Sequence, residues 1–460
     1  MQILLVEPNF PFPRKSKNKA NRTHKNFVPV GLLKFAALHK SQGDRVKLVR
    51  GKASKKEISF VPNEIYITSI FTYWSSFVWD CVGYYRKLFP KAVIRLGGIY
   101  ATLHARNRKF LRLARKYKVK IFKGISKEAE GYYPDYTILP QVEYHATHMM
   151  RGCIRKCSFC GTWRLEPERS YKTKDEIIRE LTVIKKNKVI FFDNNILANP
   201  NIKEILKEFM QLRINGKPVV FESQSGFDGR LLEADSKLAR LIRRARFQNV
   251  RIAWDNGLED KTSVKKQIDI LKRAGYLAKN ISVFMIYNFN ISYENMLKKI
   301  AKCKRWGVQI LDCRYRPLDL DYDGYNPHLK KAQPEGSYYI HRDAGWDDAK
   351  IRDFRSRVRK HNIWVRYAKD KGRDYDRKME KWSAINNTYK FFDLRRPFHM
   401  RRIEKSAYLQ KKIRLLNKIK KFYILNNISP NGVGSYSLNE LERYVKKNIE
   451  KNNIIPLAKG

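Results

Sequence analysis

Residues 151–163 read Arg-Gly-Cys-Ile-Arg-Lys-Cys-Ser-Phe-Cys-Gly-Thr-Trp, and this stretch decides how the rest of the chain is interpreted. Three of the six cysteines, Cys153, Cys157 and Cys160, lie here within eight positions of one another. Thiolates are soft ligands that suit iron–sulfur clusters and zinc. A structural zinc site would need a fourth Cys or His at matching spacing, and the loop offers none. The spacing therefore favours a [4Fe–4S] cluster whose fourth iron has no protein ligand.

Strands and helices are predicted to alternate on the carboxyl side of this motif. The predicted strands lie at 147–151, 188–193, 219–222, 249–254, 280–287 and 309–314. The predicted helices lie between them, at 174–185, 201–212, 237–244, 261–274 and 293–305. Six such units are too few for an eightfold barrel, so residues 146–318 are expected to form a partial (β/α)6 barrel.

Residues 1–125 are predicted to form a separate α/β domain, a doubly wound (Rossmann-like) parallel sheet, followed by a connector at 126–145. Its predicted strands are 2–7, 45–49, 64–69 and 92–96, its helices are 31–42 and 76–88, and a Pro-rich basic loop covers 8–28. Strands that alternate with helices favour a parallel sheet. Ligands of such sheets bind beyond the carboxyl ends of the strands.

From residue 319 to residue 460 the alternation stops, and a basic helical C-terminal region is predicted, with helices at 347–361, 406–422 and 438–448. The whole chain carries 96 Lys and Arg against 44 Asp and Glu, a formal net charge of +52. Such an excess attracts nucleic acid and anionic lipid. The basic residues run through the whole chain, so a compositional bias and a polyanion-binding role both remain open.

Other classes of protein fit the sequence poorly. No stretch approaches the roughly 20 apolar residues of a membrane-spanning helix. The first residues lack the basic flank and cleavage site of a signal peptide and are typical of a buried strand. Six cysteines in 460 residues are too few for a disulfide-stabilised scaffold. We therefore expect a cytoplasmic protein without a membrane span.

Cys-x3-Cys-x2-Cys with an aromatic residue, here Phe159, before the last Cys resembles the signature of the radical S-adenosylmethionine (SAM) superfamily. In that family the motif follows the first strand of a partial barrel, as it is expected to do here. The resemblance implies that SAM chelates the open iron and is cleaved reductively to a 5′-deoxyadenosyl radical. It also implies an electron donor such as flavodoxin or ferredoxin.

The resemblance and the polar residues at the predicted strand ends together give six candidate SAM contacts. They are Asp193 and Asn195 after the second strand, Gln224 and Arg230 after the third, Asp255 after the fourth and Asn288 after the fifth. Each residue type is also common at helix caps, turns and solvated loops. The Gly-x-Ile-x-Gly-x-x-Glu stretch of many family members is missing, because residues 288–294 occupy its place. No catalytic residue is assigned.

An α/β domain before a radical SAM barrel resembles the cobalamin-binding subclass of the family. Residues 28–33 and the glycine pair Gly97-Gly98 carry this likeness. The Asp-x-His-x-x-Gly motif of many cobalamin proteins is absent. Cobalamin is therefore a candidate cofactor, and bound cobalamin would favour methyl transfer. The alternatives are a structural remnant and a platform for the substrate.

Two classes of substrate remain. The first is a small molecule, lipid or peptide, and the second is RNA held by the basic surface, although no OB-fold or RRM module is recognisable. A non-catalytic basic protein with a structural cluster is a third reading, and the open iron argues against it. The sequence does not name the substrate.

Overall fold

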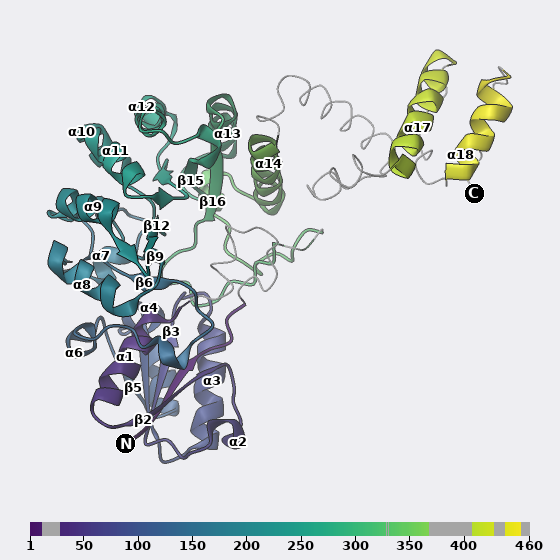
Figure 1. Cartoon of the computed structure of the whole chain (residues 1–460). Helices are drawn as coiled ribbons and strands as arrows, with labels where there is room; N and C mark the ends of the chain where they lie inside the picture. Colours follow the sequence, from purple (N-terminus) through teal and green to yellow (C-terminus); the bar gives the residue numbers. More distant parts are fainter. Residues whose placement is uncertain (12–27, 328, 330, 368–406, 427–437, 452–460) are drawn as a thin grey trace. The chain divides into compact units, whose positions relative to one another are not determined.

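The structure of the protein is a computed structural model that describes residues 1–11, 28–327, 329, 331–367, 407–426 and 438–451. Most of the predicted basic loop at 8–28 therefore lies outside the described residues. The chain divides into two compact units, Met1–Arg355 and Ser356–Gly460 (Figure 1). Within the described residues, no helix is both long and apolar enough to span a bilayer.

The first sheet has five parallel strands in the order β2-β1-β3-β4-β5. Its strands are β1 (Gln2–Glu7), β2 (Arg45–Arg50), β3 (Glu64–Ser69), β4 (Val93–Gly98) and β5 (Val119–Ile121). The direction of winding reverses between β1 and β3, and ligands of doubly wound sheets bind at such a switch point. The sequence predicted four of these strands and missed the short edge strand β5.

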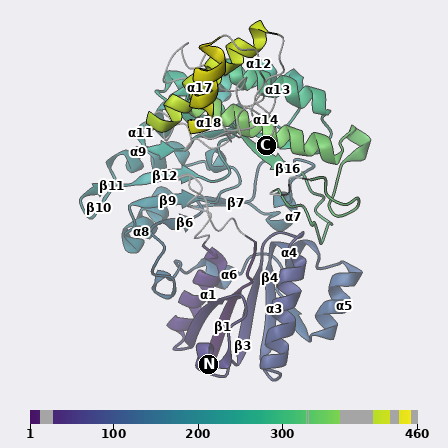
Figure 2. The same cartoon turned by 90° about the vertical axis from the view of Figure 1, so that its right-hand side faces the viewer.

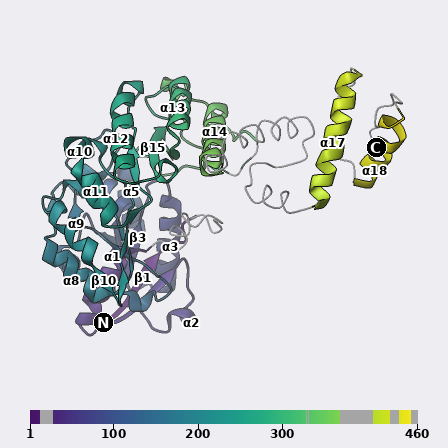
Figure 3. The same ribbon diagram turned by 45° about the horizontal axis from the view of Figure 1, so that its top comes forward.

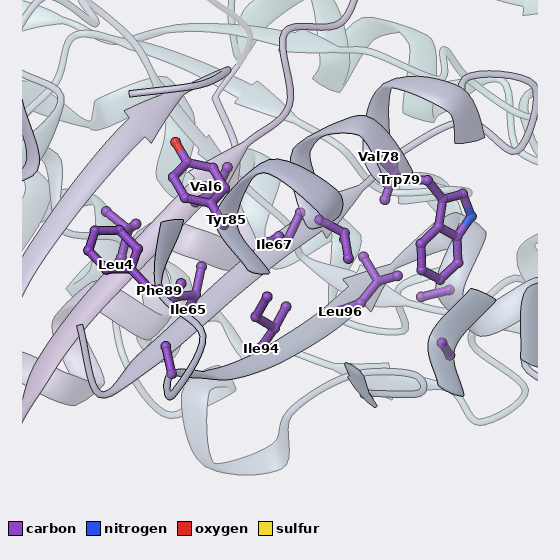
Figure 4. Close-up of a cluster of buried hydrophobic side chains, with 14 of the residues drawn as sticks. Leu4, Val6, Ile65, Ile67, Val78, Trp79, Tyr85, Phe89, Ile94 and Leu96 are labelled. Atoms are coloured by element: carbon purple, nitrogen blue, oxygen red, sulfur yellow. The ribbon is translucent and has the colours of Figure 1, made fainter. Parts of the chain in front are cut away.

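Helices pack on both faces of this sheet. They are α1 (Val30–Ser41), α2 (Lys55–Ile58), α3 (Ser75–Leu88), α4 (Ile99–Leu103) and α5 (Arg108–Lys116). Leu4 and Val6 belong to the large core that includes α3 (Figure 4), and Ile3 and Leu5 pack with α1 residues. Because successive side chains of a strand point to opposite faces, the four consecutive apolar residues 3–6 of β1 are what a two-sided core requires.

The connector carries α6 (Lys127–Glu130) and a 3-10 turn, η3 (Tyr136–Ile138), and two further parallel sheets follow. One has the order β13-β12-β9-β6 and the other the order β14-β15-β16. Their strands are β6 (His145–Thr147), β9 (Lys188–Phe191), β12 (Val220–Ser223), β13 (Phe247–Gln248), β14 (Arg251–Ala253), β15 (Ser282–Tyr287) and β16 (Gln309–Arg314). A bridge between Phe227 and Ile252 links the two sheets.

Helices alternate with these strands. They are α8 (Lys174–Ile184), α9 (Ile202–Gln211), α10 (Gly229–Ala234), α11 (Lys237–Arg244), α12 (Lys261–Arg273) and α13 (Tyr293–Trp306). In Figures 1 and 3 they follow one another along the outer side of the strands. The sequence predicted five of them to within one or two residues and missed α10. A small hairpin, β10 (Arg213–Ile214) with β11 (Lys217–Pro218), projects after α9.

One strand prediction in this region was wrong, and a second strand is shorter than predicted. The strand expected at 147–151 is β6 followed by β7 (Met150–Arg151), which pairs antiparallel with β8 (Ser170–Tyr171). The amide N–H groups of Met149 and Met150 donate to the Asp193 carboxylate, which takes them out of the parallel sheet. The strand expected at 249–254 is the shorter β14, and the sequence missed β13 before it; Asn249, with a φ of +52°, lies between these two strands of different sheets.

The first helix of the predicted C-terminal region begins within one residue of its predicted start at 347. Residues 319–347 contain a 3-10 turn, η7 (Arg342–Ala344), and the first long helix is α14 (Asp348–Tyr367). In the second unit, α17 (Ala407–Leu425) packs against α18 (Leu438–Tyr444) and the π-helical turn η9 (Val445–Ile449). Their shared core consists of Leu416, Ile419, Phe422, Tyr423, Leu441, Tyr444 and Val445.

Candidate functional site

The three cysteines of the motif lie on the loop between β7 and α7 (Thr162–Leu165), which we call the cysteine loop (residues 152–161). All three thiols are free and half-buried. The amide of Cys160 donates to the carbonyl of Cys157 across 3.1 Å, so the second half of the loop is a tight turn. The loop therefore presents its thiols from a compact backbone.

The start of the loop is fixed by a glycine and a glutamate. Gly152 has a φ of +71°, and a Cβ there would lie 2.7 Å from the carbonyl oxygen of Glu168. Only glycine fits this conformation and this space. The Gly152 amide donates to the Glu166 carboxylate at 2.7 Å, and Arg151 donates to the other Glu166 oxygen at 3.0 Å. The chain is thus held just before Cys153.

Hydrogen bonds also surround the sulfur atoms. The Arg155 amide donates to Cys153 Sγ across 3.3 Å, and Thr162 Oγ1 lies 3.3 Å from Cys160 Sγ. The Trp163 indole donates to the Cys157 carbonyl at 3.2 Å. Hydrogen bonds to sulfur tune the charge that a thiolate cluster can carry. This donor set fits a cluster held by thiolates.

Asp228 joins the cysteine loop to the neighbouring strand ends. Its Oδ2 accepts from Arg155 Nε at 3.0 Å and from Asn195 Nδ2 at 3.0 Å, and its Oδ1 accepts from Arg230 Nε at 2.9 Å. The Asp228 side chain is only 6% exposed, and these cations hold its pKa below the usual range although burial opposes this. Asp228 therefore stays ionised and brings two predicted residues, Asn195 and Arg230, to the loop.

Asn195 has one polar atom without a protein partner. The residue is 5% exposed, and its Oδ1 is buried without a hydrogen bond in the described part of the chain. A buried unpartnered oxygen is costly, so a site for a bound donor group is the simplest use of this atom. Gln224 directly follows β12 and is half-buried, and its backbone N–H donates to the Phe191 carbonyl at the end of β9 across 2.8 Å.

Asp255 is presented by a rigid turn after β14. The ammonium group of Lys299, which is fully buried, donates to the carbonyls of Trp254 and Asn256 at 2.6 and 2.8 Å and so clamps the residues on either side of Asp255. Burial raises the pKa of Asp255 to about 6. Burial and then the charge of Asp255 raise the pKa of the Cys157 thiol.

Two of the predicted SAM contacts bind backbone groups of the protein itself. Both oxygens of the fully buried Asp193 accept backbone N–H groups of Met149 and Met150, so its contacts position the chain that leads to the cysteine loop. Asn288 is also fully buried, and its amide binds the backbone of Tyr339 and His341 at 3.1 and 2.8 Å. These contacts favour structural roles for both residues.

The aromatic residue of the motif packs against the end of the fifth strand. The Phe159 ring lies edge-on to Phe289, with centroids 5.8 Å apart, and Phe289 in turn packs on Tyr315. This contact closes the cysteine loop over strands β15 and β16. An apolar neighbour of this kind limits the access of water to the thiols.

Within the described residues, no three His, Cys, Asp or Glu side chains converge as ligands of a single metal ion.

A cavity of about 310 Å³ lies between the first sheet and the segment that leads to the cysteine loop. Its floor is formed by the carboxyl ends of β3 and β4, next to the switch point, with Gly97 and Gly98 at the end of β4 and Gly31 at the start of α1. His148 and Arg151 line the opposite wall. Burial keeps the pKa of His148 well below its ordinary value, so the imidazole is neutral.

The sequence missed several residues that build this site. Asp228 follows the predicted third strand but looked like an ordinary helix cap, which it also is, for α10. Lys299 looked like one of many lysines on an amphipathic helix. Only Glu166 and Gly152 could have been suspected from the sequence, because they flank the motif. Their roles depend on the backbone conformation at Gly152, which the sequence does not show.

Comparison with known proteins bears on the central domain. Residues 147–311 match the Radical SAM superfamily model. No curated protein is similar enough in sequence to count as a relative. Among solved structures, methylornithine synthase (PylB) aligns with a TM-score of 0.31 and 11% identity, over 48% of this chain and 62% of that one. The matched part thus spans less than two thirds of that protein. This chain carries a radical SAM domain at residues 147–311.

Proposed function

We propose that this protein is an enzyme that cleaves SAM reductively with a [4Fe–4S] cluster on Cys153, Cys157 and Cys160. The observation that carries the proposal is the cysteine loop, three free thiols on a backbone that Gly152, Glu166 and Trp163 hold in place. When bound, such a cluster supplies the electron that converts SAM into a 5′-deoxyadenosyl radical. The parallel strands β6 to β16 would form the partial barrel around it.

The residues around the loop suit a zwitterionic ligand with a ribose. The Asn195 oxygen without a partner can accept from an ammonium group, and Arg230, whose side chain is 59% exposed, can turn toward a carboxylate. Asp255 can accept from ribose hydroxyls, and Gln224 offers an amide at the same rim. Asp228 has no such freedom, because it orients Arg155, Asn195 and Arg230.

We also propose that the cavity below the loop binds an organic ligand close to the reaction. It lies next to the switch point of the sheet, where ligands of such sheets bind. Arg151 lines the cavity and also donates to Glu166, which holds Gly152. The volume of the cavity, about 310 Å³, is at the lower end of the range for small-ligand sites. A corrinoid is larger, so the cavity by itself does not enclose cobalamin, and a substrate is the better fit.

Anaerobic reconstitution with iron and sulfide tests the enzyme proposal. We expect the broad visible absorption that is typical of an iron–sulfur cluster. After reduction, we also expect the formation of 5′-deoxyadenosine from SAM. The Cys157→Ala variant should give neither. Fully clustered, reduced protein that forms no 5′-deoxyadenosine with any substrate would contradict the proposal.

The same spectrum tests the cavity. Protein purified without oxygen from cobalamin-fed cells is expected to lack corrinoid absorption. In the Gly31→Leu variant the new side chain should fill the cavity, because no atom lies within 4 Å of a Cβ at this position. We expect this variant to keep its cluster and to lose turnover of the substrate. One corrinoid per chain in the wild type and none in the Gly31→Leu variant would show that the ligand of the cavity is cobalamin and not the substrate.

A further inference from the structure

A strongly basic surface lies on α5, far along the chain from the cysteine loop. Half of the residues between 106 and 123 are Lys or Arg and none is Asp or Glu, whereas Lys and Arg make up about one fifth of the whole chain. The α5 face, as we name it, consists of Arg106, Arg108, Lys109, Arg112, Arg115 and Lys116, all exposed. Of these, only Lys109 forms an ion pair among the described residues, with Asp321 at 2.8 Å.

The helix presents these charges on one side. Phe110 and Ala114 are buried at 1% and 4% exposure and attach α5 to the core of the first sheet. Arg108, Arg112 and Arg115 stand at i, i+4 and i+7, so they share the opposite side over about 10 Å. The apolar side is already covered, and the charged side faces solvent.

The charges act against the helix that carries them. Cations at i and i+3 or i+4 repel one another, and Arg108 and Lys109 stand in the first turn, where the helix dipole disfavours positive charge. The Asn107 cap, which accepts from the Phe110 amide at 3.1 Å, offsets part of this. An arrangement that opposes its own stability suggests an external anion that relieves the repulsion.

The lysines that follow α5 have a different explanation. Lys118 and Lys120 flank or lie on β5, the edge strand of the sheet. Charged side chains on an edge strand prevent pairing with another chain. They are therefore left out of the α5 face. The helix α5 has no edge to protect, so this explanation does not extend to its arginines.

The α5 face is connected to the cysteine loop by packed elements. The helix α4 contacts α7, which directly follows the loop (Figure 2). His104, between α4 and α5, lies 3.1 Å from the Leu318 carbonyl, and a Cβ on Gly161 would contact Leu103 and Leu318. The helix α5 therefore belongs to the same compact unit as the cysteine loop and is joined to it through packed elements.

We propose that the α5 face binds the phosphate backbone of a nucleic acid. Four of its six cations are arginines, which bind phosphate with paired hydrogen bonds. None of the large exposed hydrophobic side chains of the described chain lies on α5, so the helix has nothing to insert into a lipid bilayer. No aromatic side chain is exposed there either, so the contact is to the backbone rather than to stacked bases. The proposal does not depend on the SAM chemistry.

The test is the binding of labelled bulk tRNA and of a 20-base-pair DNA duplex to the full chain over a range of salt concentrations. The test variant is Arg108→Gln, Arg112→Gln and Arg115→Gln combined. The matched control is Lys237→Gln, Arg240→Gln and Arg244→Gln combined, which removes three exposed cations from α11 in the same compact unit. Thermal midpoints of both variants check folding, and Arg112→Gln alone serves as a milder variant.

We expect the α5 variant to bind at least tenfold more weakly at about 150 mM salt, with the slope of log K against log salt reduced by about 2 to 3. The control should change binding less than twofold, and Arg112→Gln alone should reduce the slope by about 1. Equal losses of affinity in the α5 and α11 variants would show that binding depends only on the total positive charge of the chain, and this would overturn the proposal. Binding to phosphatidylserine vesicles but to neither nucleic acid would overturn it as well.

Discussion

Arg155 Nε donates to Asp228 Oδ2 across 3.0 Å, and this ion pair joins the cysteine loop to the N-cap of α10. The Asp228→Asn variant should keep the helix cap, since Asn and Asp cap equally well, but lose the pair. We expect a loss of about 1–3 kcal/mol in the stability of the loop. Iron and sulfide content after anaerobic reconstitution should fall accordingly.

Arg230→Gln provides the comparison for this prediction. Arg230 also contacts Asp228 but is 59% exposed, so its ion pair is worth less than about 1 kcal/mol. Its variant should keep full iron content and lose affinity for SAM only. If both variants lose iron equally, Asp228 does not act through Arg155.

The three motif cysteines should differ sharply from the exposed Cys313. Replacement of Cys153, Cys157 or Cys160 by Ala is expected to abolish the cluster absorption and the formation of 5′-deoxyadenosine. Cys313→Ala should retain the cluster, because Cys313 lies on β16 outside the loop. Loss of iron in Cys313→Ala would mean that a fourth thiolate occupies the open iron position, and SAM could then not bind there.

Asp255 and Lys299 should act as one unit in binding SAM. Asp255→Asn removes a charged acceptor and is expected to weaken SAM binding about tenfold. Lys299→Met removes the clamp on the carbonyls of Trp254 and Asn256 and should have a similar effect. Because the lysine acts through the aspartate, the double variant should be no weaker than either single one. Equilibrium dialysis with SAM measures this, and additive losses would separate the two residues.

Gly98 should tolerate no side chain. Its φ is +94°, and a Cβ would lie 2.1 Å from the Ser69 carbonyl oxygen. Gly98→Ala is expected to cost more than about 3 kcal/mol, since two backbone strands must separate. Gly43→Ala, with a φ of +79° and no atom within 4 Å, should cost only about 1 kcal/mol. Thermal midpoints of the two variants give the comparison, and equal midpoints would contradict the close packing of β3 and β4.

The stability of the central domain should fall in acid because of Glu180. This carboxylate is buried, which opposes ionisation, yet His145 and Lys172 lower its pKa from 4.5 to about 2. The stabilisation is therefore complete above pH 4.5 and is lost as the pH falls toward 2. Burial also lowers the pKa of His145, so charging this imidazole below pH 6.5 costs further stability.

Glu180→Gln measures this contribution. The thermal midpoint of cluster-free protein should fall between pH 5 and pH 3 by several degrees more in the wild type than in the variant. Cluster-free protein is used so that acid release of iron plays no part. A pH dependence that is unchanged in Glu180→Gln would show that other groups control the acid lability.

Much of the fold could be predicted from local patterns. Buried runs such as 2–7 and 64–69 and the amphipathic helix at 237–244 carry their own periodicity, and β1, β3 and α11 have these bounds. Errors came where a contact from far away decided the backbone. Asp193 draws Met149 and Met150 out of the parallel sheet, which no pattern near those residues indicates.

The sequence by itself determined the spacing of Cys153, Cys157 and Cys160, because three thiols within eight positions are already a local ligand set. Only the tertiary structure decided what holds and faces them. The Arg155–Asp228 pair, the Lys299 clamp and the cavity above Gly98 join residues that are more than 40 positions apart in the chain. Such contacts follow from strand order and packing, so the α5 face too became visible only when Phe110 and Ala114 were seen buried beneath it.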